Sequence, residues 1–134
     1  MRVLIVEDHA DTAALLLRVF RNAGCEAHAV AISFEALRLS NELRFDLLIA
    51  DIGLPEMDGW NLLSHVRRHT AIKAIAITGF GKDVDLASSR AAGFDVHLTK
   101  PVEIPHLMRT VEKLMGHNLH SAQAPADQRS LQGS

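Results

Sequence analysis

The sequence predicts a doubly wound α/β fold with a parallel sheet, and three observations lead to this prediction. Short apolar runs alternate with segments of helical period along most of the chain. Most runs are continuous rather than interrupted by polar residues, which is typical of strands covered on both faces by helices. Glycine or proline often falls between segments, where an element would end. Repeated strand–helix alternation favours parallel strands with helices on both faces.

Five strands are expected, one for each apolar run. They cover Val3–Val6, Ala27–Ile32, Leu47–Ala50, Ile72–Ile77 and Val96–Leu98. A sheet of this kind places its functional groups beyond the carboxyl ends of the strands. The residues that follow each strand are therefore the first place to look for a site.

Helices are predicted between the strands from apolar residues that share one helical face. An early example is formed by Leu62, Leu63 and Val66. The last helix has a longer stripe, made of Leu107, Met108, Val111, Leu114 and Met115. The segment from Lys82 to Ala92 has only Val84, Ala87 and Ala91 on its apolar face, so weak packing is expected for it.

Several residues are expected to mark helix ends. Asp11 and Ser33 are of the type that caps helix N-termini. Gly24 and Gly93 are placed to follow helix C-termini, and Pro105 suits a first helical turn.

Length and composition bound the class of protein. The 134 residues fit one domain, taken as residues 1–117, followed by a flexible tail at 118–134 that lacks apolar period. A net charge of −2 gives no electrostatic footprint for nucleic acid or an anionic membrane. The single cysteine, Cys25, excludes a disulfide framework. With no apolar run long enough for a signal peptide or a membrane span, a cytoplasmic protein is expected.

Polar groups follow four of the five predicted strands. Glu7 and Asp8 follow the first, and Asp51 ends the third. Thr78 ends the fourth, and Lys100 follows the fifth. Because the carboxyl ends of parallel strands meet at one edge, three carboxylates, a hydroxyl and an ammonium group are expected there.

Carboxylates brought together repel one another, so such a cluster calls for a cation. Mg²⁺ prefers oxygen ligands, and an ammonium group adds a second positive charge. Together they would neutralise an incoming phosphoryl group, for which positioning and charge stabilisation are the main requirements. A carboxylate is able to act as the nucleophile, and Asp51, at the end of the third predicted strand, is the best candidate.

This pattern resembles the receiver domain of two-component response regulators. The matching segments are VEDH with Glu7 and Asp8, ADIGLPEMDG with Asp51, AITG with Thr78, and HLTKP with Lys100. The resemblance extends over roughly residues 2 to 117, and the segments DIGLPEMDG, TGFG and AAGFDVHLTKPVE are most similar to receivers of hybrid sensor histidine kinases.

The resemblance implies a five-stranded parallel sheet of order 2-1-3-4-5 and a phosphoryl acceptor at Asp51. The donor would be a histidine of a sensor kinase or a phosphotransfer protein. Asp8, Asp51 and the backbone carbonyl of Gly53 would hold Mg²⁺, with Glu7 acting through water. Thr78 and Lys100 would bind the phosphoryl group, and the Lys100–Pro101 peptide bond is often cis in the family. Such a domain is not an enzyme with a separate substrate, since it assists only its own phosphorylation and dephosphorylation.

One position departs from the family pattern. His97 stands where the family usually has an aromatic residue that turns inward as the threonine moves. Two hypotheses stay open, that His97 is a weaker switch or that it is a passive strand residue. The face formed by helix 82–92, strand 96–98 and helix 104–116 is expected to bind an output partner.

Other functions fit the residues less well. A phosphatase of the haloacid dehalogenase type needs a second aspartate two residues after the nucleophile, where this chain has Gly53. A flavodoxin-like cofactor site needs a polar, uncharged phosphate loop, and the first loop here is acidic. A receiver that binds partners without phosphorylation is disfavoured by the complete acid set. His65 and His69 have i, i+4 spacing but no evident third zinc ligand.

Overall fold

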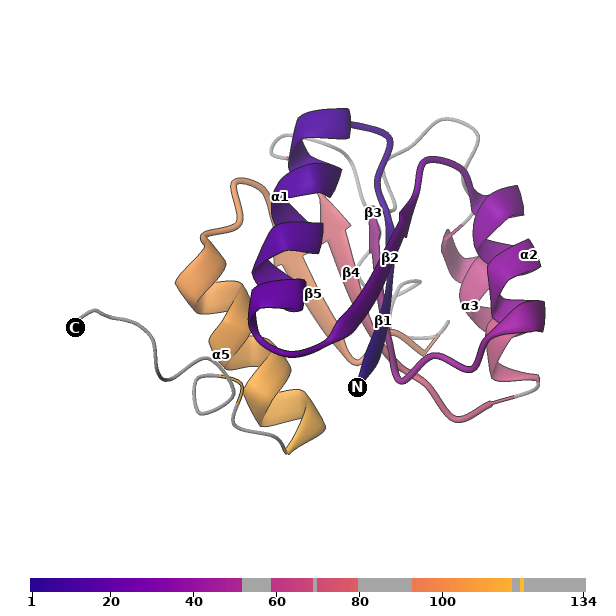
Figure 1. Ribbon diagram of the computed structural model, residues 1–134. Helices are drawn as coiled ribbons and strands as arrows, with labels where there is room; N and C mark the ends of the chain where they lie inside the picture. Colours follow the sequence, from indigo (N-terminus) through magenta and orange to yellow (C-terminus); the bar gives the residue numbers. More distant parts are fainter. Residues whose placement is uncertain (52–58, 69, 80–92, 117–118, 120–134) are drawn as a thin grey trace.

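The computed structural model describes residues 1–51, 59–68, 70–79, 93–116 and 119. Five strands form its sheet: β1 (Arg2–Val6), β2 (Glu26–Val30), β3 (Leu47–Asp51), β4 (Lys73–Thr78) and β5 (Val96–Thr99). The order is β2-β1-β3-β4-β5 and each neighbouring pair is parallel (Figure 1). The predicted fold class and strand order are confirmed, and each strand differs from its predicted range by one or two residues at one or both ends.

Helices cover both faces of this sheet. α1 (Ala10–Asn22) and α5 (Ile104–Met115) lie on one side, and α2 (Ser33–Glu42) and α3 (Gly59–Arg67) on the other (Figure 1). The helix expected at 82–92 lies outside the described residues. None of the helices in the described part of the chain is both long and apolar enough to cross a membrane.

The sheet separates two apolar cores, because successive strand residues point to opposite faces. On the α1/α5 side, Val3, Ile5 and Phe20 pack with Leu107 and Val111. On the α2/α3 side, the alternate strand residues pack with the helices; the buried set includes Leu4, Val6, Leu48, Ala50, Leu62, Leu63 and Val66. All residues of β3 are buried, which explains why its sequence is continuously apolar up to Asp51.

The two predicted N-caps are wrong. The cap of α1 is His9 and the cap of α2 is Ile32, and neither makes a side-chain capping bond. An N-cap needs extended backbone, which Ile32 has (φ −134°, ψ 154°), whereas Ser33 is already the first helical residue. Asp11 lies inside the first turn of α1, where its charge still favours the helix dipole.

The predicted glycine after the first helix and the predicted proline at the start of the last helix are confirmed. Gly24 (φ 89°) follows α1, and Pro105 lies in the first turn of α5. After α5 the chain turns through Gly116, and Leu119 is buried in the α1/α5 core. The Leu119 backbone N–H donates to Glu112 Oε2 over 2.8 Å, which ties Leu119 to α5. Leu119 thus packs with the domain although it lies two residues past the predicted boundary.

An arginine at the end of α3 ties three segments together at the amino ends of β4 and β5. Arg67 Nε and Nη2 donate to the carbonyl of Ile72 at 3.1 and 2.9 Å, and Nη1 donates to the carbonyl of Gly93. Nη2 also pairs with Asp95 Oδ2 at 2.9 Å, and that oxygen accepts the Ala74 backbone N–H at 2.8 Å. We call this set the Arg67 clasp.

Gly93→Ala is expected to destabilise the domain by about 3 kcal/mol. Gly93 has φ 100°, a conformation that side chains rarely adopt, and an added Cβ would collide with Arg67 Nη1. An arginine tip usually moves aside easily, but this one is held by the bonds of the clasp. Urea unfolding of both proteins measures the difference.

Gly116→Ala is the matched control. Gly116 also has positive φ (74°), but an added Cβ there meets nothing within 4 Å. Only backbone strain remains, so a cost of about 1 kcal/mol is expected. Equal costs for the two substitutions would show that the clasp does not resist displacement.

Candidate functional site

The carboxyl ends of β1, β3, β4 and β5 bring together the polar residues singled out in the sequence. Glu7 follows β1, Asp51 and Thr78 are the last residues of β3 and β4, and Lys100 follows β5. Glu7, Asp51 and Thr78 are only 4%, 7% and 4% exposed. Such burial of polar groups requires partners, because desolvation without a hydrogen bond is costly.

Lys100 is the shared partner of the two buried carboxylates. Its Nζ donates to Asp51 Oδ2 at 2.8 Å and to Glu7 Oε1 at 3.3 Å. Burial by itself lowers the pKa of Lys100, but the hydrogen bond and charge of Asp51, together with Glu7, outweigh it and hold the pKa above its ordinary value. The lysine is therefore an ammonium ion fixed beside Asp51. The Lys100–Pro101 peptide bond is cis.

Glu7 is held at both carboxylate oxygens. Oε1 faces Lys100, and Oε2 accepts the backbone N–H of His9 at 3.0 Å. Its own backbone N–H donates to the Val30 carbonyl at 2.9 Å. The sequence suggested only a role through water for Glu7 and did not indicate a direct contact with Lys100. This contact joins the residue after β1 to the residue after β5. It could have been inferred from the sequence only with the strand order in hand.

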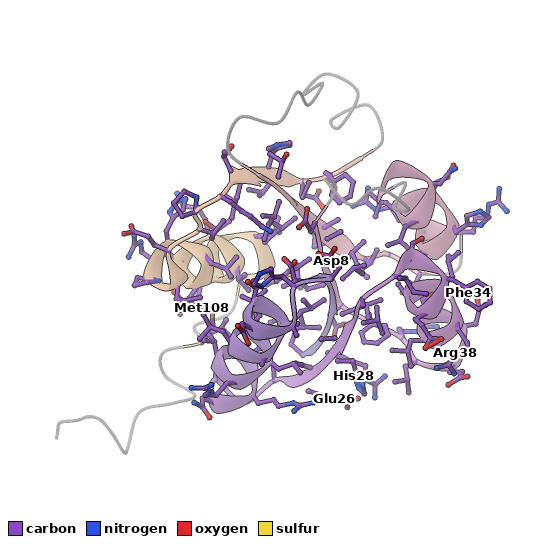
Figure 2. All side chains as sticks on the ribbon, turned by 90° about the horizontal axis from the view of Figure 1, so that it is seen from above. Asp8, Glu26, His28, Phe34, Arg38 and Met108 are labelled. Carbon is purple, nitrogen blue, oxygen red and sulfur yellow. The ribbon has the colours of Figure 1, made fainter. Side chains whose placement is uncertain are left out.

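The acids also form a group suited to a hard cation. Glu7, Asp8 and Asp51 each offer a carboxylate oxygen, and these oxygens lie within 4.8 Å of one another. Asp8 is the exposed member and lies near the middle of the molecule seen from above, between the α5 side marked by Met108 and the α2 side marked by Phe34 (Figure 2). An all-oxygen donor set with one open side fits Mg²⁺. Gly53 and His69 lie outside the described residues.

Thr78 is the last residue of β4, the strand that pairs with β3 and its terminal Asp51. Its Oγ1 is buried and has no hydrogen-bond partner among the described residues. Buried hydroxyls are nearly always paired, so an orphan at the edge of an acidic site is suited to donate to a group that enters the site.

His97 is half-buried and its Nε2 atom is buried. It pairs in register with Ala76, and its neighbours Val96 and Leu98 pack on the α1/α5 side. His97 therefore belongs to the opposite face, the one shared by Ala76 and Thr78. Its role as a switch stays a prediction.

We compared the sequence with models of known protein families. Residues 3–112 match the model of the response regulator receiver domain. The chain belongs to the response regulator receiver family. Receiver domains of this family serve two-component signalling, so the class inferred from the strand-end residues is confirmed.

Relatives of this receiver domain include both single-domain regulators and parts of longer kinases. Polar-differentiation response regulator DivK of Brucella anthropi is 31% identical over 119 residues, which are 85% of this chain and 95% of DivK. Hybrid signal transduction histidine kinase G of Dictyostelium discoideum is 29% identical, and the match covers 84% of this chain but 4% of the kinase.

A solved structure extends the comparison to the site. The receiver domain of sensor histidine kinase PA1611 of Pseudomonas aeruginosa PAO1 has a magnesium ion coordinated in its active site cleft. It is 26% identical to this receiver domain with a TM-score of 0.72, and the match covers 86% of this chain and 97% of that one.

Proposed function

We propose that this receiver domain accepts a phosphoryl group on Asp51 and thereby changes how it binds a partner. The observation that carries the proposal is the 2.8 Å contact between Lys100 Nζ and Asp51 Oδ2 at the edge where the strand-end acids meet. A carboxylate beside a fixed ammonium group is held ready to attack an electrophile whose charge that ammonium group neutralises.

Each residue has a distinct task in the proposed transfer. An Asp51 oxygen attacks phosphorus, and the bond from phosphorus to the donor's histidine nitrogen breaks as the acyl phosphate forms. Lys100 pairs with one phosphoryl oxygen, and the orphaned hydroxyl of Thr78 donates to another. Both groups stabilise charge on the equatorial oxygens, which is the main catalytic requirement of phosphoryl transfer.

Mg²⁺ is the proposed cofactor. Asp8 and Asp51 would hold it, with Glu7 acting through water and the backbone carbonyl of Gly53 as the further expected ligand. When bound, the ion offsets repulsion between the acids and the phosphoryl oxygens. The likeness to the PA1611 receiver, which has magnesium in its cleft, supports this assignment.

The proposed donor is a histidine of a sensor kinase or of a phosphotransfer protein, as expected for a cytoplasmic two-component relay. The proposed output surface is the face formed by helix 82–92, strand 96–98 and helix 104–116; among its described residues, Pro105, His106, Arg109 and Lys113 of α5 are exposed. No turnover of a separate substrate is proposed, because the phosphoryl group stays on the domain until the domain is dephosphorylated.

Intact mass spectrometry tests this proposal. Incubation with phosphoramidate and Mg²⁺ is expected to add the mass of one phosphoryl group, and peptide mapping after borohydride trapping is expected to place it on Asp51. Chelation of the metal before the donor is added is expected to slow the gain strongly. Uptake at a histidine or serine, or uptake indifferent to chelation, would contradict the proposal.

A further inference from the structure

β2 forms one edge of the sheet, because it pairs with β1 and with no other strand in the described part of the chain. Glu26, at the start of β2, donates its backbone N–H to the Met1 carbonyl on the β1 side. Along a parallel strand, residues that bond one neighbour alternate with residues that face the other way. Ala27 and Ala29 therefore direct their backbone N–H and carbonyl groups away from β1. β2 passes between α1 and α2, so these groups lie along the open edge of the sheet (Figure 1).

Arg21 covers part of this edge. It lies in the last turn of α1, and its Nη2 donates to the Ala27 carbonyl at 2.9 Å. Ala27 is only 2% exposed although it belongs to an edge strand. Ala29 is half-buried, and none of the described residues bonds its backbone N–H or carbonyl. The guanidinium group thus occupies one outward carbonyl of β2 and leaves the next one open.

The same edge is complementary to a second copy of itself. With a two-fold axis at His28, two antiparallel β2 strands would place Ala27 of each copy opposite Ala29 of the other. Both residues direct their N–H and carbonyl groups outward, so each such pair would exchange both of its hydrogen bonds. An interface that uses one surface on both copies closes at a dimer. The Ala27 carbonyl that Arg21 holds is an acceptor that this pairing requires.

We propose that Arg21 prevents this receiver domain from pairing with a second copy of the chain through β2. An uncovered edge strand is a template for another strand, and charged side chains at the edge oppose such pairing. Arg21 opposes it in two ways, because it occupies the Ala27 carbonyl and places a positive charge where the second strand would lie. This role does not depend on phosphoryl transfer at Asp51.

Sedimentation velocity of the full chain over a range of protein concentrations, without a phosphodonor, tests the proposal. Arg21→Ala is expected to dimerise about tenfold more tightly than the wild type, because its Ala27 carbonyl no longer has a charged donor to give up. Arg21 is exposed, so its truncation spares the core. Amide hydrogen exchange followed by NMR locates the contact. In Arg21→Ala, protection of the Ala29 N–H is expected to rise with protein concentration.

Arg18→Ala is the matched control, since Arg18 is exposed on the same helix and makes no hydrogen bond to the described residues. It is expected to associate as the wild type does. Adding Ala29→Pro to Arg21→Ala removes the outward N–H and keeps the bonds to β1, so association is expected to return to the wild-type level. Equal association of Arg21→Ala and the wild type, or dimers of Arg21→Ala without concentration-dependent protection of Ala29, would overturn the proposal.

Discussion

Asp51→Asn is expected to abolish phosphoryl uptake from phosphoramidate. The amide keeps the size of the side chain, but its oxygen lacks the negative charge that makes a carboxylate nucleophilic, so no acyl phosphate forms. Neither Glu7 nor Asp8 is expected to replace it, because Glu7 is held by Lys100 and by the His9 backbone, and Asp8 is exposed. Intact mass after incubation with the donor and Mg²⁺ measures the uptake.

Asp11→Asn is the control for the loss of one negative charge near the site. Asp11 is an exposed residue in the first turn of α1 and belongs to neither the metal group nor the Lys100 contacts. This variant is expected to take up the phosphoryl group at nearly the wild-type rate. Full uptake by Asp51→Asn would show that another residue is the acceptor.

Lys100→Met is expected to lower the free energy of unfolding by about 2–3 kcal/mol at neutral pH without divalent cations. The substitution keeps the apolar stem and leaves the carboxylates of Glu7 and Asp51 buried without their shared cation. The usual cost of breaking a buried pair is reduced here because the lysine side chain is 33% exposed. Urea unfolding measures the effect, and added Mg²⁺ is expected to restore part of the loss.

The pH dependence of this effect has a definite sign. Because the pKa of Lys100 is raised in the folded state, its contribution to stability is complete below the ordinary lysine pKa. It is lost as the pH rises through the raised value. The difference between the wild type and Lys100→Met is therefore expected to stay constant through neutral pH and to shrink above about pH 10.

Lys113→Met controls for the loss of a lysine charge, since Lys113 is exposed on α5. It is expected to change the free energy of unfolding by less than about 0.5 kcal/mol. If Lys100→Met were as stable as Lys113→Met in the absence of metal, the two carboxylates would not depend on this ammonium group.

The parts of the fold that the sequence predicted well are those governed by burial. Strands covered on both faces have no polar alternation, and β3 shows this directly, with each residue buried up to Asp51. The strand order came from the resemblance to a family rather than from periodicity, which carries no information on neighbours. Helix starts were predicted poorly, because a polar residue such as Ser33 looks the same one position before a helix or one position inside it.

Contacts between distant segments were the part that could not be predicted. The Arg67 clasp joins α3 to the amino ends of β4 and β5, and nothing near Arg67 in the sequence marks its partners. The strand-end acids were found from sequence because topology alone gathers them.

The division of the interior by the sheet has a consequence for how this protein tolerates change. Phe20 and Val111 lie on one side and Leu48 and Val66 on the other, and among the described residues the two cores have no member in common. Substitutions on opposite sides should therefore be nearly independent in their energetic effects. Substitutions could therefore accumulate in the core next to α2 and α3 without changing the packing of the core that borders the acceptor site.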